Sequence, residues 1–74
     1  MPSRRLPGVL LTVNGQPFAA PEGTDLPELL TSLGLPVGTV VVEHNGVALL
    51  RSELAAIDLR EGDRVELVRA VAGG

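Results

Sequence analysis

The sequence predicts an α+β domain in which one main helix packs on a mixed sheet of four or five strands. A chain of 74 residues forms one domain that buries only about 60% of its unfolded surface, so the core must be simple. Its hydrophobic residues are nearly all Leu, Val and Ala, with a single Phe and no Trp or Tyr. Most apolar stretches are β-branched and extended, whereas one segment has helical spacing. We therefore expect one domain over residues 1–74, with residues 1–8 as a lead-in and residues 70–74 as a flexible tail.

The first elements are expected to be two antiparallel strands. Residues 9–13 are apolar and end at Asn14-Gly15, a pair that tolerates the positive φ angles of a type I′ hairpin turn. Residues 16–20 then return as a second strand. Pro17 has no N–H to donate to a neighbouring strand, so this second strand should lie at a sheet edge.

The leucine spacing predicts the main helix. Thr24 is placed to cap it, Gly34 to follow its C-terminus, and Pro36 to prevent its continuation. Residues at positions i, i+3, i+4 and i+7 share one helical face. The expected buried face consists of Leu26, Leu29, Leu30 and Leu33.

The second half of the chain is again extended. In chain order we expect an inner strand at residues 39–44, an Asn45-Gly46 turn, a short strand at 47–50, a helical turn at 51–55 that Ser52 could cap, a tight turn at 61–63, and a last strand at 64–68. This order of elements is that of the β-grasp, or ubiquitin-like, fold. In that fold the last strand lies centrally, beside the first.

Composition excludes several classes of function. The net charge is −3, with nine acidic residues, six Arg and no Lys, which argues against a nucleic-acid partner. The absence of Cys rules out disulfides and cysteine-based zinc sites. The apolar runs are too short to span a membrane, so a cytoplasmic protein is expected.

The polar residues offer no enzymatic constellation. His44 is the sole histidine, so neither a Ser-His-Asp triad nor a multi-histidine metal site can form. We expect it at a strand end beside a turn, with a partner contact as the alternative. Glu61 and Asp63 flank Gly62 without the spacing of a calcium loop, and are interpreted as a solvated turn. No Gly-rich segment precedes a lysine, so no nucleotide cofactor should be bound by this chain.

The tail is the feature that packing does not explain. Gly73 and Gly74 contribute no side chain to a core and are costly to order. Extended at about 3.3 Å per residue, residues 70–74 would carry a carboxylate roughly 15 Å beyond the sheet. Without Cβ atoms, such a tail fits a narrow channel and leaves its carbonyl carbon open to a nucleophile. The alternative is an ordinary frayed terminus.

An ordered set of short motifs resembles the ThiS-type sulfur carriers of thiamine biosynthesis. The resemblance covers residues 9–74 and leaves only the lead-in outside it. The motifs are Asn14-Gly15, Gly23-Thr24 before Glu28-Leu29-Leu30, Leu33-Gly34, residues 42–47, residues 61–66, and the final Gly73-Gly74. Where many relatives carry an aromatic or His shortly before the glycines, this chain has Arg69-Ala70-Val71-Ala72.

The resemblance implies a carrier that is not itself an enzyme. A ThiF-like, E1-type enzyme would adenylate the Gly74 carboxylate with ATP, and Gly73, Ala72 and Val71 would form the tail that enters its active site. A sulfur donor protein would supply the sulfur of a thiocarboxylate, which a ThiG-like thiazole synthase would consume. The small subunit of molybdopterin synthase shares this fold and chemistry and remains an alternative. A modifier that attaches to amines, or an interaction module with an inert tail, are further alternatives.

A docking surface for these partners is expected on the open face of the sheet. Because the first and last strands should be neighbours, Leu10 and Val68 would form one exposed apolar spot. Arg64, Glu66 and Arg69 would surround it.

Overall fold

The computed structural model describes residues 8–69, which form a five-stranded sheet, one α-helix and one 3₁₀ helix. The strands are β1 (Gly8–Val13), β2 (Gln16–Pro21), β3 (Val40–His44), β4 (Val47–Leu49) and β5 (Arg64–Arg69). The helices are α1 (Leu26–Ser32) and η1 (Arg51–Ala56). Gly8, expected in the lead-in, is the first residue of β1. The expected tail, residues 70–74, lies outside the described residues.

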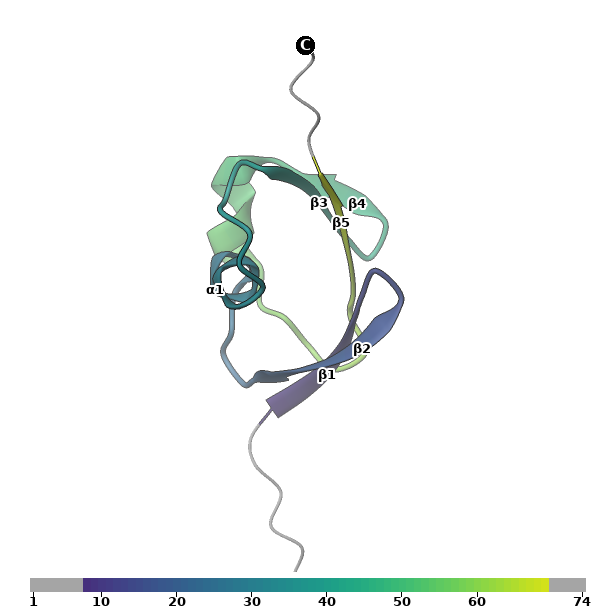
Figure 1. The fold of residues 1–74 in the computed structure, drawn as a ribbon. Helices are drawn as coiled ribbons and strands as arrows, with labels where there is room; N and C mark the ends of the chain where they lie inside the picture. Colours follow the sequence, from purple (N-terminus) through teal and green to yellow (C-terminus); the bar gives the residue numbers. More distant parts are fainter. Residues whose placement is uncertain (1–7, 70–74) are drawn as a thin grey trace, which may run out of the picture.

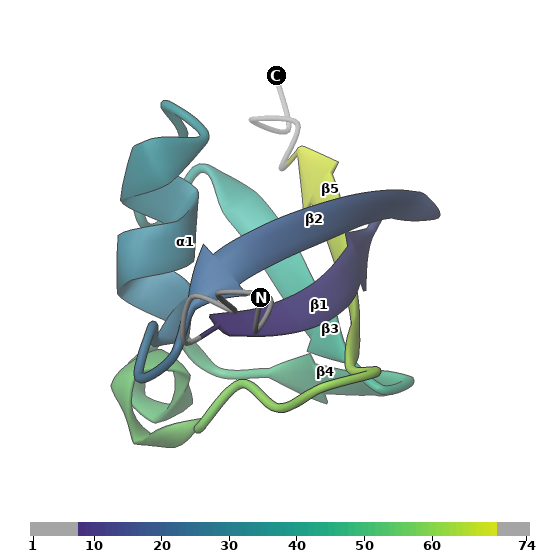
Figure 2. The same ribbon diagram turned by 90° about the horizontal axis from the view of Figure 1, so that it is seen from below.

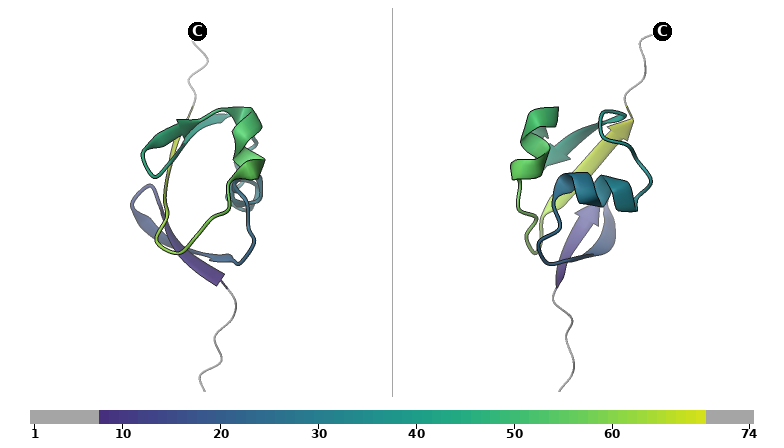
Figure 3. Two further views of the ribbon diagram at one scale, coloured as in Figure 1. Left: turned by 180° about the vertical axis from the view of Figure 1, so that it is seen from behind. Right: turned by 90° about the vertical axis from the view of Figure 1, so that its left-hand side faces the viewer.

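The strand order is β2-β1-β5-β3-β4, which confirms the predicted β-grasp arrangement. β5 is parallel to β1 and antiparallel to β3, so the last described strand has a neighbour on each side. Figure 1 shows the sheet curving around α1, and Figure 2 shows the same arrangement from below. Both helices lie on one side of the sheet, and no described element covers the other side (Figure 3).

The core fills the space between α1 and the concave side of the sheet. Leu26, Leu29 and Leu30 of α1 are fully buried, as the leucine spacing predicts, while Leu33 is half-buried at the helix end. Burying a leucine or valine side chain contributes about 1.5–3 kcal/mol. The sheet contributes Leu11, Val13, Ala20, Val42 and Val65, and the segment around η1 contributes Leu54 and Leu59.

The N-terminal cap of α1 is Asp25, so the prediction of Thr24 was wrong. The Asp25 side chain accepts a hydrogen bond from the Glu28 N–H at 2.9 Å, and the Glu28 side chain accepts one from the Asp25 N–H at 3.2 Å. This reciprocal pair is a capping box. Thr24 instead donates its hydroxyl to the carbonyl of Pro21 at 2.6 Å, which closes the preceding turn.

The 3₁₀ helix η1 also begins differently from the expectation. Its N-cap is Leu50, not Ser52. Glu53 Oε1 accepts a hydrogen bond from the Leu50 N–H at 2.7 Å, and the Glu53 N–H donates to the Leu50 carbonyl at 2.9 Å. A carboxylate inside the first turn thus satisfies the backbone group that a capping serine would leave free.

The two Asn-Gly turns do more than reverse the chain. Asn14 and Asn45 adopt φ angles of 50° and 51°, as the hairpin turns require, and both side chains reach β5. Asn14 Oδ1 accepts from the Leu67 N–H at 2.7 Å, and its amide nitrogen donates to the Leu67 carbonyl at 3.3 Å. Asn45 Oδ1 accepts from the Arg64 N–H at 2.8 Å. The central strand is therefore held from both hairpins.

The outer edge of β2 is protected from pairing with another strand. In a hairpin with a two-residue turn, the residues that flank the turn exchange hydrogen bonds, and pairs alternate from there. The register Val13↔Gln16 therefore directs the backbone of Pro17, Ala19 and Pro21 toward solvent. Two of these three residues have no N–H, which blunts the edge and confirms the edge position predicted from Pro17.

Replacing Asn14 with Gly distinguishes the two roles of this residue, which are to form the turn and to hydrogen-bond β5. Glycine accepts the positive φ at least as well as Asn, but it cannot bond Leu67. We expect Asn14→Gly to lower the free energy of unfolding by about 1–2 kcal/mol, measured by urea denaturation. Gly46→Asn strains the backbone of the second turn without removing a side-chain bond to β5, so its loss of stability shows the cost of turn strain alone. Unchanged stability of Asn14→Gly would show that the side-chain bridge contributes nothing.

Candidate functional site

The candidate site centres on β5, because this strand leads into the predicted carrier tail. Residues 70–74, including Gly74, lie outside the described residues, so the structure defines only the base of the tail. That base is the central strand of the sheet, paired with β3 over Val40↔Arg69 to His44↔Val65. A tail that follows Arg69 thus starts from a strand with neighbours along its length.

The turn before β5 is fixed by a polar cluster around Asp63. His44 Nε2 lies 2.7 Å from Asp63 Oδ2, and because an ionised carboxylate only accepts, the imidazole donates. The Arg60 N–H donates to the same oxygen at 2.9 Å, and Asn45 Nδ2 donates to Oδ1 at 3.1 Å. His44 is indeed at a strand end beside a turn, where it contacts this chain's own Asp63.

These contacts change the acidity of Asp63. Partial burial acts to raise the pKa of its carboxyl, but the hydrogen bonds from His44, the Arg60 backbone and Asn45 outweigh it, together with the charge of His44. The net pKa of Asp63 therefore lies below its ordinary value. The carboxylate stabilises the corner where the β3–β4 hairpin meets the start of β5.

The 61–63 segment is a turn with Glu61 and Gly62 exposed, as expected, but its side chains also make structural hydrogen bonds. Besides the bonds of Asp63, Glu61 Oε1 accepts a hydrogen bond from the Leu10 N–H at 2.8 Å. The Gly62 N–H donates to the Leu10 carbonyl at 2.8 Å, which anchors the turn beside β1. Both carboxylates therefore hold backbone groups in place.

The uncovered face of the sheet carries a row of exposed apolar side chains. Val68 and Val41 lie directly opposite one another on β5 and β3, with 56% and 45% of their surfaces exposed. The β3–β4 ladder ends at Val42↔Leu49, and continuing its alternation by one residue brings Leu50, 68% exposed, to the open face next to Val41. This apolar row of Leu50, Val41 and Val68 lies at the end of the sheet from which the chain continues past Arg69.

The predicted docking spot of Leu10 and Val68 does not exist as one patch. Both side chains are exposed on the open face, but the parallel register pairs Thr12 with Arg64. Leu10 lies two residues before that pair and Val68 four residues after it, so at about 3.3 Å per residue they are roughly 20 Å apart. Adjacency of the two strands was predicted correctly, whereas their register was not deducible from the pattern.

The charged residues expected around this spot divide between the two faces. Side chains alternate along a strand, so Arg64 and Glu66 share the open face with Val68, whereas Arg69 points to the opposite side. Glu66 lies directly opposite Glu43 of β3. The structure thus adds Leu50, Val41 and Glu43 to the site, and only the strand register could have identified them.

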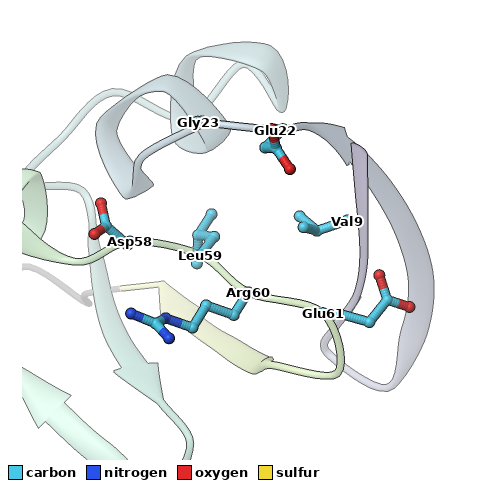
Figure 4. A pocket seen from close by; sticks show the side chains of 7 residues that line it. All are labelled: Val9, Glu22, Gly23, Asp58, Leu59, Arg60 and Glu61. Carbon is cyan, nitrogen blue, oxygen red and sulfur yellow. The ribbon is translucent and has the colours of Figure 1, made fainter. Parts of the chain in front are cut away.

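A shallow pocket on another part of the surface does not suit a nucleotide. Its volume is about 360 Å³, and its lining residues are Val9, Glu22, Gly23, Asp58, Leu59, Arg60 and Glu61. Figure 4 shows Val9 and Leu59 in the middle of this ring, with three carboxylates around them. One arginine against three acids is a poor match for phosphate groups.

The structure describes residues 8–69. Within this range no group of three or more His, Asp or Glu side chains is arranged to hold a metal ion. Neither of the described helices has the length and apolar character needed to cross a membrane.

Fold and site together define a small ubiquitin-like β-grasp domain whose central last strand borders an exposed apolar row. Residues 5–74 match the sequence model of the ThiS family, and the chain belongs to this family. The crystal structure of a thiamine biosynthesis protein (ThiS) from Geobacter metallireducens is similar to it, with 36% identity and a TM-score of 0.71. That match covers 89% of this chain and 100% of the other.

A second similarity is to a longer protein. A thiazole synthase from Magnetococcus marinus is 39% identical over 62 residues, which cover 84% of this chain. This chain spans only 19% of the length of that relative.

Replacing Asp63 with Asn tests the polar corner. A lowered folded-state pKa adds stability that is present above the unfolded pKa of about 3.9 and is lost as pH falls through the folded value. We expect Asp63→Asn to lose about 1–3 kcal/mol near neutral pH, and its deficit relative to wild type should shrink on acidification. Urea unfolding at several pH values measures this. A deficit that is constant from neutral pH to below pH 3 or so would contradict the assignment.

Proposed function

We propose that this chain is a sulfur carrier protein of thiamine biosynthesis, acted on by partner enzymes and not itself catalytic. The observation that carries the proposal is the ThiS family match, which continues through Gly73 and Gly74. The central position of β5 supports it, because the proposed carrier residue Gly74 is only the fifth residue after the end of this strand.

The proposed chemistry takes place on the main chain. The Gly74 carboxylate attacks the α-phosphate of ATP on a ThiF-like, E1-type enzyme, which gives an acyl adenylate and releases pyrophosphate. A sulfur donor protein delivers sulfur at the sulfide level, which attacks the acyl carbon, forms the C–S bond and displaces AMP, leaving a thiocarboxylate. A carboxylate is a poor electrophile until one oxygen becomes part of a leaving group, which explains the need for ATP. Because this step consumes ATP, we place it in the cytoplasm.

This chain would contribute access rather than catalysis. Gly73 and Gly74 have no Cβ atoms that would obstruct a narrow active site. The sequence contains no cysteine or lysine that could capture the activated acyl group within the chain. Nucleotide binding is assigned to the adenylating enzyme, since the pocket in Figure 4 is ringed by carboxylates.

A ThiG-like thiazole synthase is the proposed recipient of the sulfur. Similarity to a segment of a much longer thiazole synthase supports an association between this kind of domain and a synthase. The ThiS match also favours thiazole formation over the molybdopterin pathway.

Intact-mass spectrometry tests the carrier proposal. The protein is incubated with ATP, the ThiF-type enzyme of the same genome and a sulfur source, after its native C-terminus has been verified by mass. Replacement of one oxygen by sulfur on Gly74 is expected, and Gly74 deletion should abolish it with thermal stability unchanged. Isopeptide conjugates would instead indicate a modifier, and no change with an active enzyme would contradict a carrier role.

We further propose that the adenylating enzyme docks on the apolar row beside β5. Val68→Asp places a charge in this row, whereas Leu10→Asp makes the same chemical change at the other end of the open face. We expect Val68→Asp to weaken binding at least tenfold, about 1.4 kcal/mol, and Leu10→Asp to leave it unchanged. Titration calorimetry gives the affinities, and circular dichroism checks the fold. Equal losses of affinity in the two variants would show that the enzyme does not dock specifically on the apolar row.

A further inference from the structure

The open face places two carboxylates directly beside the apolar row. Glu43 and Glu66 are cross-strand partners in the antiparallel β3–β5 register. They are two residues along each strand from the Val41–Val68 pair and therefore its next neighbours on the same face. Directly opposite residues have Cβ atoms about 4.5–5.5 Å apart, and like charges in such positions disfavour the pairing. Glu43 is half-buried and Glu66 is exposed.

Within residues 8–69, no arginine or histidine forms a salt bridge with Glu43 or Glu66. The ion pair found within residues 8–69 is that of His44 with Asp63. Arg64 shares the open face and lies two residues before Glu66, on the side away from the apolar row. Its register partner on β1 is Thr12. A single external cation could approach both carboxylates at once.

We propose that Glu43 and Glu66 bind one lysine or arginine side chain of the adenylating enzyme, and that this contact positions the enzyme over the apolar row. The inference rests on the proposed function. It adds the chemistry of the partner surface, an apolar patch with an adjacent cation. Covering the apolar row excludes water from the neighbouring charges, which strengthens their attraction to a cation. Such charge complementarity acts on the association rate and on the choice of partner more than on total affinity.

The residues that surround the pair support a role in orientation. The apolar row alone is made of three similar aliphatic side chains, which a flat apolar surface could cover in several orientations. A carboxylate pair on one side of the row removes that ambiguity. Because β5 carries both Glu66 and Val68, a partner fixed at these two residues is also placed at a defined position relative to Arg69, the last described residue of this strand.

The double variant Glu43→Gln/Glu66→Gln tests the inference. Its binding to the ThiF-type enzyme is measured by surface plasmon resonance at low and high salt. We expect the affinity at low salt to fall roughly fivefold or more, mainly through a slower association rate, and the salt dependence to weaken. Glu66→Lys should have a larger effect. Glu22→Gln removes one carboxylate charge in the β2–α1 turn, away from the open face, and should bind like wild type.

Two independent readouts separate the possible failures. Removing the repulsion should leave the melting temperature of the double variant equal to or above that of wild type, and a lower value would overturn the inference in favour of a structural role. At saturating enzyme the double variant should still form the thiocarboxylate. If wild type is converted but the double variant binds with unchanged affinity and salt dependence, the cation contact is wrong and the carrier function stands. If the double variant lost affinity only for the thiazole synthase and not for the adenylating enzyme, the inference would likewise be overturned. If wild type is never converted, both proposals fail.

Discussion

The pairing of β5 with strands on both sides is the constraint on which the rest of the structure depends. The parallel contact with β1 is short, with a register of Thr12↔Arg64 and Val13↔Val65. It is prolonged by the Asn14 side chain, which bonds both backbone groups of Leu67. On the other side, the five-residue ladder with β3 is continued by Asn45. Where each hairpin turns away from β5, an asparagine side chain makes the hydrogen bonds that a neighbouring strand would otherwise make. β5 is therefore hydrogen-bonded past the ends of both ladders.

This arrangement places the core and the proposed docking surface on opposite sides of the sheet. The concave side is covered by α1 and η1 and contains the core, including the fully buried Val65. The other side is left open, and along β5 it carries an arginine, a glutamate and a valine at alternate positions. A change at these outward positions alters the surface without touching the core. The proposed docking surface can therefore diverge between relatives while the strand beneath it keeps its place.

Local chemistry made most of the fold predictable, while the site depended on contacts between distant segments. The two Asn-Gly pairs and the leucine spacing identified the turns and α1, because positive φ and helical periodicity are properties of short segments. The cap of α1 was misplaced by one residue, since Thr24 and Asp25 are both good capping residues and only the hydrogen-bond geometry distinguishes them. The patch of Leu10 and Val68 failed for another reason. The position of β5 along β1 is set by Gly62, Glu61 and Asn14, none of which marks the register in the sequence.

The central claim is that β5 is a rigid base for the proposed carrier tail, and native-state amide hydrogen exchange tests it most directly. The amides of β5 that donate hydrogen bonds, such as that of Leu67, should exchange only through global unfolding. Their opening free energy should equal the free energy of unfolding from urea denaturation. Opening of β5 at a markedly lower free energy than that of the β1–β2 hairpin would contradict the account, because the tail would then begin from a strand that detaches on its own.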